Sequence, residues 1–324
     1  ITGLTLGSTV IIGQYTGQRE YGKVKRAIGT TLTVFAGVAL ALTAGMLALL
    51  RPLLRLLQTP QPSFELTVQY VTICMLGNIF ICGYNAISAV LRGWGDSRRP
   101  MWFVGIACAI NIVLDVVFVR LFALDAAGTA LATVISQGIS MALAVVYLRR
   151  HDFLFDFRLP SFLPDRRMIK KLAVVGVPIS FQELMVRISF LYLAAVMNRC
   201  GVYAASVVGI SSKYDVFAML SATSMASALA AITAQNIGAG RPQRARRSLW
   251  YGMGFALAAS TGFWLWAQLS PQSMIGLFSR DADVIAAGVP FFRACSYDYM
   301  LVSVVFCLNG YLNGRQKTVW TMIS

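Results

Sequence analysis

Long apolar runs alternate with short charged segments along the whole chain. A hydrocarbon core about 30 Å thick is crossed by roughly 20 apolar residues in a helix, and runs of this size recur throughout the sequence. The pattern predicts an all-α polytopic membrane protein with eight complete spans and two partial ones. We expect the complete spans at residues 27–50, 66–91, 101–121, 126–148, 172–198, 202–234, 248–268 and 285–312, and the partial ones at 1–14 and from 318 onward.

Basic residues mark every second loop between these spans. Lys and Arg are enriched in the cytoplasmic loops of membrane proteins, and here twenty of them fall in one set of loops against five in the alternate set. The sequence therefore predicts a multi-pass protein of the bacterial inner membrane. The loops expected on the cytoplasmic side are 15–26, 92–100, 149–171, 235–247 and 313–317.

Composition supports a lipid environment. Hydrophobic residues make up 57% of the chain and charged residues 13%, whereas soluble domains carry about 25% charged residues. The net charge of +15 is spread between apolar runs and does not cluster on one soluble face, so we expect no nucleic-acid partner. The expected partners are the lipid bilayer and small amphiphilic or cationic substrates, and the chain is expected to be a monomer.

The sequence offers no pattern typical of an enzyme or of a cofactor protein. Its six cysteines form no CxxC pair and His151 is its single histidine, so neither a disulfide framework nor a metal site is indicated. A GxxxxGK[ST] phosphate-binding loop is also missing from the sequence, which excludes ATP as the direct energy source within this chain. We expect no cofactor other than a coupling ion.

A motif of the first basic loop recurs 221 residues later in the chain, and a second motif recurs at the same spacing. Two matches at one offset indicate an internal duplication. The matched pairs are Gln14 with Gln235, Gly17 with Gly238, Leu91 with Leu312, and Gly93 with Gly314.

The duplication predicts two lobes of six helices each. Both members of every pair lie on the predicted cytoplasmic side, so the repeat contains an even number of helices and its copies are related by an axis normal to the membrane. We expect twelve helices in the complete protein, of which this chain, opening at Ile1 inside an apolar run, holds about helices 2 to 11. The lobes are expected at 1–148 and 172–324, joined by a cytoplasmic linker at 149–171 that lies on the membrane surface.

Several motifs, in their order and spacing, resemble the multidrug and toxic compound extrusion (MATE) family. They are QNIGAGR at 235–241 with its weaker copy at 14–19, LRGWGDSRRPM at 91–101, NIVLDVVFV at 111–119, AAGTALATVISQ at 126–137, and VGVPIS at 175–180. The resemblance implies two lobes facing a central cavity, export of organic cations or other amphiphiles, and energy from an inward Na⁺ or H⁺ gradient.

Two features depart from the family pattern. The first helix, which carries an acidic residue of the N-lobe cation site in many members, is expected to be missing from this chain. In some members an acidic residue also lies deeper in the helix that follows the Gly-x-Pro motif, where this chain has Val186.

Three polar residues in neighbouring N-lobe spans are candidates for ion coupling. A charged side chain inside a span costs at least about 2.5 kcal/mol on insertion scales, so Asp115 is a functional candidate. Asn111 lies one helical turn away on the same face, and Thr133 reaches a similar depth in the next span. An acid, an amide and a hydroxyl together suit transient Na⁺ or a proton, and the resemblance implies the same role. The alternative is that Asp115 reaches the membrane surface or pairs with Arg120.

The second lobe contains further charged and polar side chains within its spans. Glu183 and Lys213 are placed near the midplane of adjacent helices and can form a buried pair, either as a switch or as mutual neutralisation. Asp298 is a substrate or proton candidate, and Arg187 can pair with Asp215. The expected substrate cavity or charge network comprises Glu183, Lys213, Asp298, Arg187, Asp215 and Gln182.

The combined hypothesis is a secondary antiporter that exports organic cations, drugs or other amphiphiles in exchange for H⁺ or Na⁺ by alternating access. A flippase for lipid-linked precursors or polysaccharides is the first alternative, which Arg187, Lys213 and Arg293 keep open as cationic groups. A membrane enzyme such as a polyprenyl-phosphate transferase is the second, but it would need acidic or histidine clusters in its loops, and the loops here are basic and short.

Overall fold

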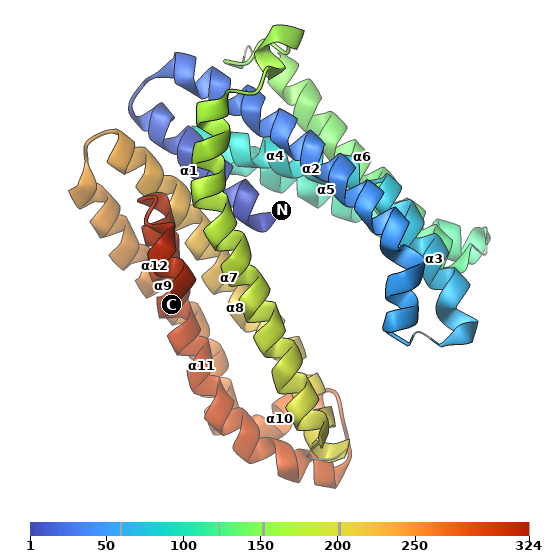
Figure 1. The fold of residues 1–324 in the computed structure, drawn as a ribbon. Coiled ribbons are helices and arrows are strands. Elements are labelled where there is room, and N and C mark those ends of the chain that lie inside the picture. Colours follow the sequence, from blue (N-terminus) through green and yellow to red (C-terminus); the bar gives the residue numbers. More distant parts are fainter. Residues whose placement is uncertain (59, 123, 151–152, 200–201, 324) are drawn as a thin grey trace. The chain divides into compact units, whose positions relative to one another are not determined.

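The computed structural model describes residues 1–58, 60–122, 124–150, 153–199 and 202–323, so His151 and Cys200 lie outside it. Within these ranges the chain is helical and contains no strand (Figure 1). A π-helical turn, Val117–Leu121, continues α5, and a short 3-10 helix lies at Leu159–Phe162. The α-helices are α1 (Thr2–Gly17), α2 (Tyr21–Leu56), α3 (Gln61–Leu76), α4 (Asn78–Trp94), α5 (Arg98–Val116), α6 (Asp125–Arg150), α7 (Arg166–Arg199), α8 (Val202–Gly238), α9 (Pro242–Leu269), α10 (Pro271–Gly276), α11 (Ala282–Gly314) and α12 (Thr318–Ile323).

The chain forms two compact units. The first contains Ile1 and Ile11–Ala173, and the second contains Thr2–Val10 and Val174–Ser324. Residues of the predicted linker therefore group with the first unit, while the first turns of α1 group with the second.

Each predicted span is present as helix, with one correction. Six helices of the described chain are long and apolar enough to cross a membrane, and the pair α3 and α4 makes a seventh when counted as one span. That pair corresponds to the predicted span 66–91, which is bent by 43° at Gly77. The chain comes close to α6 at this bend, since a Cβ at Gly77 would lie 2.3 Å from the Val134 Cγ2. The predicted span 248–268 is present as α9 but is not among the seven.

The turns between helices confirm the internal repeat. Helix α1 ends at Gly17 and α2 begins at Tyr21, while α8 ends at Gly238 and α9 begins at Pro242, both 221 residues later. Left-handed backbone recurs at the same offset, at Arg19 (φ 59°) and Gly240 (φ 70°), and at Gly95 (φ 104°) and Gln316 (φ 59°). The motif residues Gln14, Gly17, Gln235, Gly238, Gly93 and Gly314 all lie in the last turns of α1, α8, α4 and α11.

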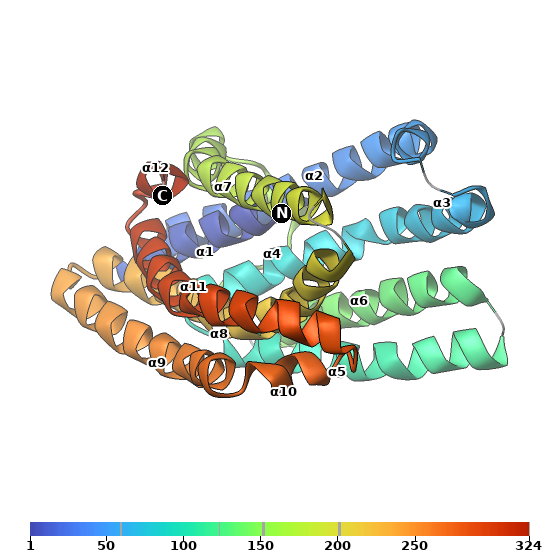
Figure 2. The ribbon, with the colours of Figure 1, turned by 90° about the horizontal axis from the view of Figure 1, so that it is seen from below.

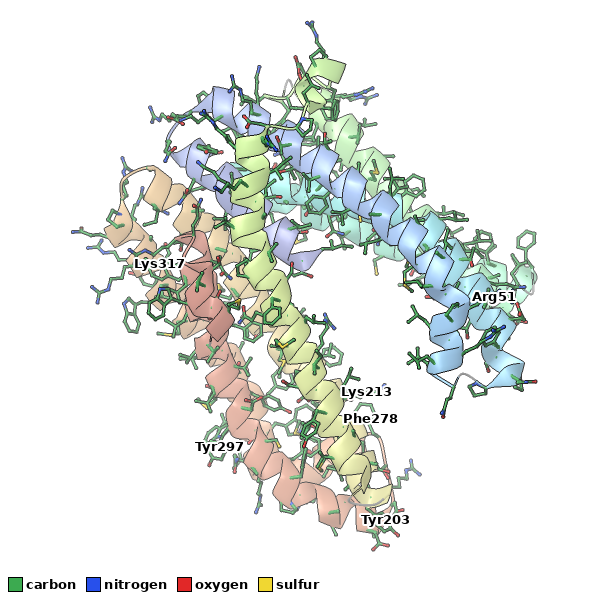
Figure 3. The ribbon with its side chains drawn as sticks, in the orientation of Figure 1. Arg51, Tyr203, Lys213, Phe278, Tyr297 and Lys317 are labelled. Atoms are coloured by element: carbon green, nitrogen blue, oxygen red, sulfur yellow. The ribbon has the colours of Figure 1, made fainter. Side chains whose placement is uncertain are left out.

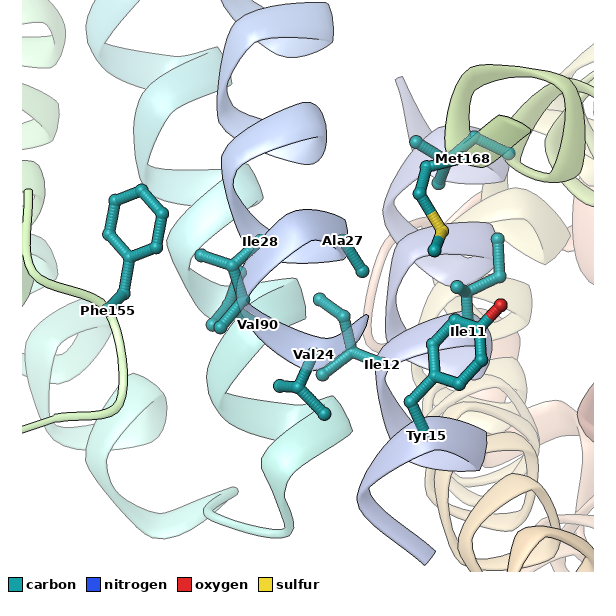
Figure 4. Close-up of a cluster of buried hydrophobic side chains, with 10 residues drawn as sticks. Ile11, Ile12, Tyr15, Val24, Ala27, Ile28, Val90, Phe155 and Met168 are labelled. Carbon is teal, nitrogen blue, oxygen red and sulfur yellow. The ribbon is translucent and has the colours of Figure 1, made fainter. Parts of the chain in front are cut away.

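A buried cluster in the first unit joins the linker to the helices around it (Figure 4). Side chains from α1, α2, α4 and α7 meet there, and Phe155 of the linker inserts among them with 3% of its surface exposed. The cluster consists of Ile11, Ile12, Tyr15, Val24, Ala27, Ile28, Val90, Phe155, Met168 and Leu172.

The linker lies along α2. A Cβ at Gly29 would be 1.8 Å from the Ser161 carbonyl oxygen, so this close approach requires glycine. The Thr33 hydroxyl donates to the Phe162 carbonyl at 2.6 Å, and the Asp165 N–H donates to the Thr30 hydroxyl at 3.1 Å. The aromatic side chains expected to rest on the membrane surface thus pack in part against protein, because α2 offers them an apolar surface and hydrogen-bonding partners.

In the second unit α8, α9 and α11 pack against one another (Figure 2). The Ser260 hydroxyl of α9 hydrogen-bonds to that of Ser303 on α11, and both residues are fully buried. Near the other end of these helices the Tyr214 hydroxyl donates to the Met274 carbonyl at 2.7 Å, and the Tyr214 ring packs on Phe292. Polar contacts of this kind hold apolar helices together in a membrane.

Candidate functional site

The predicted coupling residues of the first unit lie on neighbouring helices. Helix α6, which carries Thr133, packs along both α5 and α3. Asn111 and Asp115 are one turn apart on α5. Tyr70, on α3, lies within electrostatic reach of the Asp115 carboxyl. Sequence reasoning did not find Tyr70, because nothing in the pattern indicates that α3 faces this part of α5.

Two polar atoms of this group are buried without a hydrogen-bond partner among the described residues. They are the Nδ2 of Asn111 and the Oδ1 of Asp115. An unpaired buried polar group costs about 1 to 3 kcal/mol, so this arrangement is stabilised by anything that pairs with it. A half-turn of the Asn111 amide exchanges its nitrogen for its oxygen. The site can therefore present two oxygens to a cation, or one carboxylate to a proton.

Arg120, the alternative partner predicted for Asp115, does not pair with it. Within the described residues no ion pair joins Asp115 to Arg120, and Arg120 is exposed. Five residues separate the two, which places them far apart around a helix, and a π-helical turn begins between them at Val117. The Thr133 hydroxyl donates to the Thr129 carbonyl at 2.9 Å, which leaves its own lone pairs free to accept or to bind a cation.

The charge pairs expected in the second unit do not form. Ion pairs among the described residues join Lys23 to Glu20, Arg51 to Glu65, and Arg99 to Asp96. Glu183 therefore lacks an ion pair with Lys213, and Arg187 lacks one with Asp215. Lys213 and Arg187 are exposed (Figure 3 labels Lys213). Lys213 and Asp215 are two positions apart and so point to different sides of α8, which means that at most one of them can face α7. Gln182 is half-buried on α7.

A different group of polar side chains forms between α8 and α11. The Asp215 carboxyl faces the hydroxyls of Ser211 and Tyr299, and Asp298 lies near enough to interact with it electrostatically. Asp298 is exposed, while Tyr299 is buried. The sequence placed Asp215 and Asp298 in one expected charge network, but it paired Asp215 with Arg187 and not with Asp298. The two carboxyl groups give this part of the second unit a negative character.

Comparison with known proteins decides the family. The family model MatE matches residues 1–117 and 178–324, which is most of the chain. The chain belongs to the MATE family. The chain is thus a multi-pass membrane transporter, as its apolar helices also indicate.

Several curated MATE relatives match along nearly the full chain. The probable multidrug resistance proteins YpnP and YoeA of Bacillus subtilis are 28% and 26% identical to it, over 96% and 99% of this chain and 69% and 71% of their own lengths. A protein of Shewanella oneidensis described as an FAD transporter is 24% identical over 95% of this chain and 70% of its own length.

Solved structures share the fold. A MATE crystal structure in the bent conformation superimposes with a TM-score of 0.92 at 21% identity, covering 99% of this chain and 71% of that one. A transporter of the MOP superfamily from Pyrococcus furiosus, whose structure is described as having a binding pocket of reverse polarity, also gives a TM-score of 0.92, at 22% identity over 99% of this chain and 72% of that one.

Proposed function

We propose that this MATE transporter exports organic cations or other amphiphiles in exchange for H⁺ or Na⁺, and that Asp115 is the coupling residue. The observation that carries the proposal is the pair of buried, unpartnered atoms on Asn111 and Asp115. A site whose polar atoms lack partners is stabilised when an ion binds. This property is what a coupling site needs, because a ligand shifts a conformational equilibrium only by its difference in affinity for the two states.

The coupling step follows from the chemistry of the three side chains. A proton on Asp115 turns an acceptor into a donor, whereas Na⁺ draws oxygens of Asp115, Asn111 and Thr133 toward itself. Either event changes how α5 packs against α6. Alternating access then carries the substrate outward as the ion moves inward, with the basic loops on the cytoplasmic side of the bacterial inner membrane. The protein works as a monomer in the bilayer.

A cationic substrate is favoured by the carboxyl groups of Asp215 and Asp298. Their proximity on α8 and α11 suits an organic cation better than the pyrophosphate of a lipid-linked precursor, which the alternative flippase function would carry. The names of two relatives, which describe probable multidrug resistance proteins, support the same substrate class.

The test is transport in proteoliposomes with an imposed Na⁺ or H⁺ gradient and a cationic dye. We expect Asp115→Asn to lower gradient-driven export by more than about tenfold, equivalent to about 1.4 kcal/mol, because it removes the titratable and charged group. Asp125→Asn, an exposed acid at the start of α6, is the matched control and should transport like the parent protein. Export by Asp115→Asn that keeps its full ion dependence would exclude this coupling role.

A further inference from the structure

A cavity of about 610 Å³ lies at the end of the first unit where basic residues gather. Three segments build it: the last turn of α4 with the turn into α5, the final part of α6, and the start of the linker. Its walls combine the aromatic rings of Trp94, Tyr147 and Phe153 with the charged side chains of Asp96, Arg98 and Arg99. The coupling site uses none of these residues.

Of the two arginines that line this cavity, Arg99 is paired and Arg98 is available to bind an anion. The Arg99 guanidinium is paired with Asp96 at 2.5 Å and lies over the Tyr147 ring at 4.6 Å. The Arg99 backbone N–H also donates to Asp96 at 3.3 Å. Arg98 is exposed and is absent from the ion pairs of the described residues. The cavity therefore offers a free guanidinium beside a neutralised carboxylate.

A neighbouring cavity of about 540 Å³ shares the Phe153 wall and adds Arg149 and Asp156. Arg149 lies over the Phe157 ring at 5.5 Å. The Ser161 hydroxyl donates to Asp156 and lowers the pKa of that carboxyl. The acid is thus engaged within the linker, while Arg149 adds a second positive charge near the first cavity.

An apolar surface begins where the arginines end. Met101 and Trp102 follow directly on α5 and are 63% and 65% exposed. Exposed residues then recur along one side of the helix at Gly105, Cys108 and Ile112. In a helix that spans a membrane such a face meets lipid tails. A guanidinium at the head of a lipid-facing stripe matches a molecule with an anionic headgroup and acyl chains.

The equivalent turn of the second unit carries different residues. At the offset of 221 residues, Arg98 and Arg99 correspond to Val319 and Trp320, and Asp96 corresponds to Lys317. Arg315 of that turn lies over the Tyr311 ring at 5.6 Å. Basic residues are thus present in both turns, but the second unit carries neither the two arginines nor the aspartate of the first at the aligned positions.

We propose that this cavity, formed by the turn between α4 and α5, Tyr147 and the linker, binds the headgroup of an anionic phospholipid whose chains lie along α5. Arg98 contacts the phosphate, and Trp94 and Phe153 provide the apolar wall beneath it. Because Phe153 and Leu154 belong to the linker, the bound lipid also holds the linker against α4 and α6.

The experiment is native mass spectrometry of the purified, delipidated protein titrated with phosphatidylglycerol or phosphatidylcholine. We expect phosphatidylglycerol to bind more tightly than phosphatidylcholine. Neutralising one arginine near a lipid surface typically weakens binding about fivefold, so Arg98→Gln should lower phosphatidylglycerol affinity by about that factor. Arg315→Gln removes the same charge from the equivalent turn of the second unit and should leave the affinity unchanged.

Three results would overturn the proposal. An equal loss of phosphatidylglycerol affinity in Arg98→Gln and Arg315→Gln would mean that the lipid responds to positive charge in general and not to a defined site. Equal binding of phosphatidylcholine would mean that the headgroup charge is not recognised. Displacement of the lipid by excess inorganic phosphate would mean that the cavity binds a free anion. The melting temperatures of both variants in phosphatidylcholine serve as the folding control, and we expect them to match that of the parent protein because Arg98 and Arg315 are both exposed.

Discussion

Helix α2 of the first unit and α9 of the second occupy equivalent places in the repeat, yet the linker lies on α2. Gly29 and Thr30 contact linker backbone, and their counterparts on α9 are Trp250 and Tyr251, which are 58% and 79% exposed. Large amphipathic rings of this kind are common at the membrane interface. The comparison teaches that one duplicated helix has been adapted to bind its own chain and the other to face its surroundings.

The two units also differ in where their long helices break. In the first unit α2 is continuous and the following span is bent at Gly77. In the second unit the equivalent of α2 is divided at Ser270 into α9 and α10, and α11 is continuous. Asp298 is the counterpart of Gly77. The repeat thus preserves the turns at the basic end while the interior of each unit has changed independently.

The largest expected effect comes from glycine positions on the paired helices. In Gly29→Ala the new Cβ meets the Ser161 carbonyl oxygen, whose backbone must move, and overpacking of this kind costs about 1 to 3 kcal/mol. Gly254→Ala on α9 adds a Cβ with nothing within 4 Å and should be neutral or stabilising by up to about 1 kcal/mol. Thermal unfolding in detergent, followed by size-exclusion chromatography, measures both. Equal melting temperatures would mean that the linker does not lie on α2.

The hydroxyl contacts of the linker should have a smaller effect. The double variant Thr30→Val, Thr33→Val removes the partners of the Asp165 N–H and the Phe162 carbonyl, each worth about 1 kcal/mol. We expect trypsin to cut the linker at Arg158 severalfold faster. Thr261→Val is the control, since its hydroxyl bonds only within α9, to the Leu257 carbonyl. Unchanged cleavage in the double variant would argue that aromatic packing alone holds the linker.

The smallest effect on stability is expected at a helix contact where the two units carry different residues. Ser260 and Ser303 are the counterparts of Ala39 and Cys82, and all four are buried. Converting the second unit to the first with Ser260→Ala, Ser303→Cys should cost about 0.6 kcal/mol, the average for a hydrogen bond between membrane helices. A decrease in melting temperature as large as that of Gly29→Ala would contradict this estimate, because it would mean that the contact contributes more than one hydrogen bond between membrane helices.

Much of the fold could be predicted, because its signals are local. Helix lengths follow from the apolar runs, and the turns follow from glycines that recur at a fixed offset. The bend at Gly77 could not be predicted, since the apolar run 66–91 continues through it and the close approach of Val134 involves another helix. The position of the linker on α2 could not be predicted either. Its pattern of alternating aromatic and charged residues is compatible both with the membrane surface and with the surface of α2.

The candidate site also has a part that the sequence predicts and a part that it does not. Asp115 and Asn111 could be proposed from the sequence because a polar pair one turn apart is rare within an apolar span. The pairing of Glu183 with Lys213 failed because depth along a helix is readable from sequence but rotation about its axis is not. Tyr70 and the association of Asp215 with Asp298 depend on which helices become neighbours, and that information lies in packing.

The linker's place on α2 also bears on how the protein is made. Its partners Gly29, Thr30, Thr33 and Trp94 all precede it in the chain, so they have already left the ribosome when the linker emerges. Domains generally fold in order of synthesis. The linker can therefore pack on α2 and α4 before α8 and the helices after it have been synthesised.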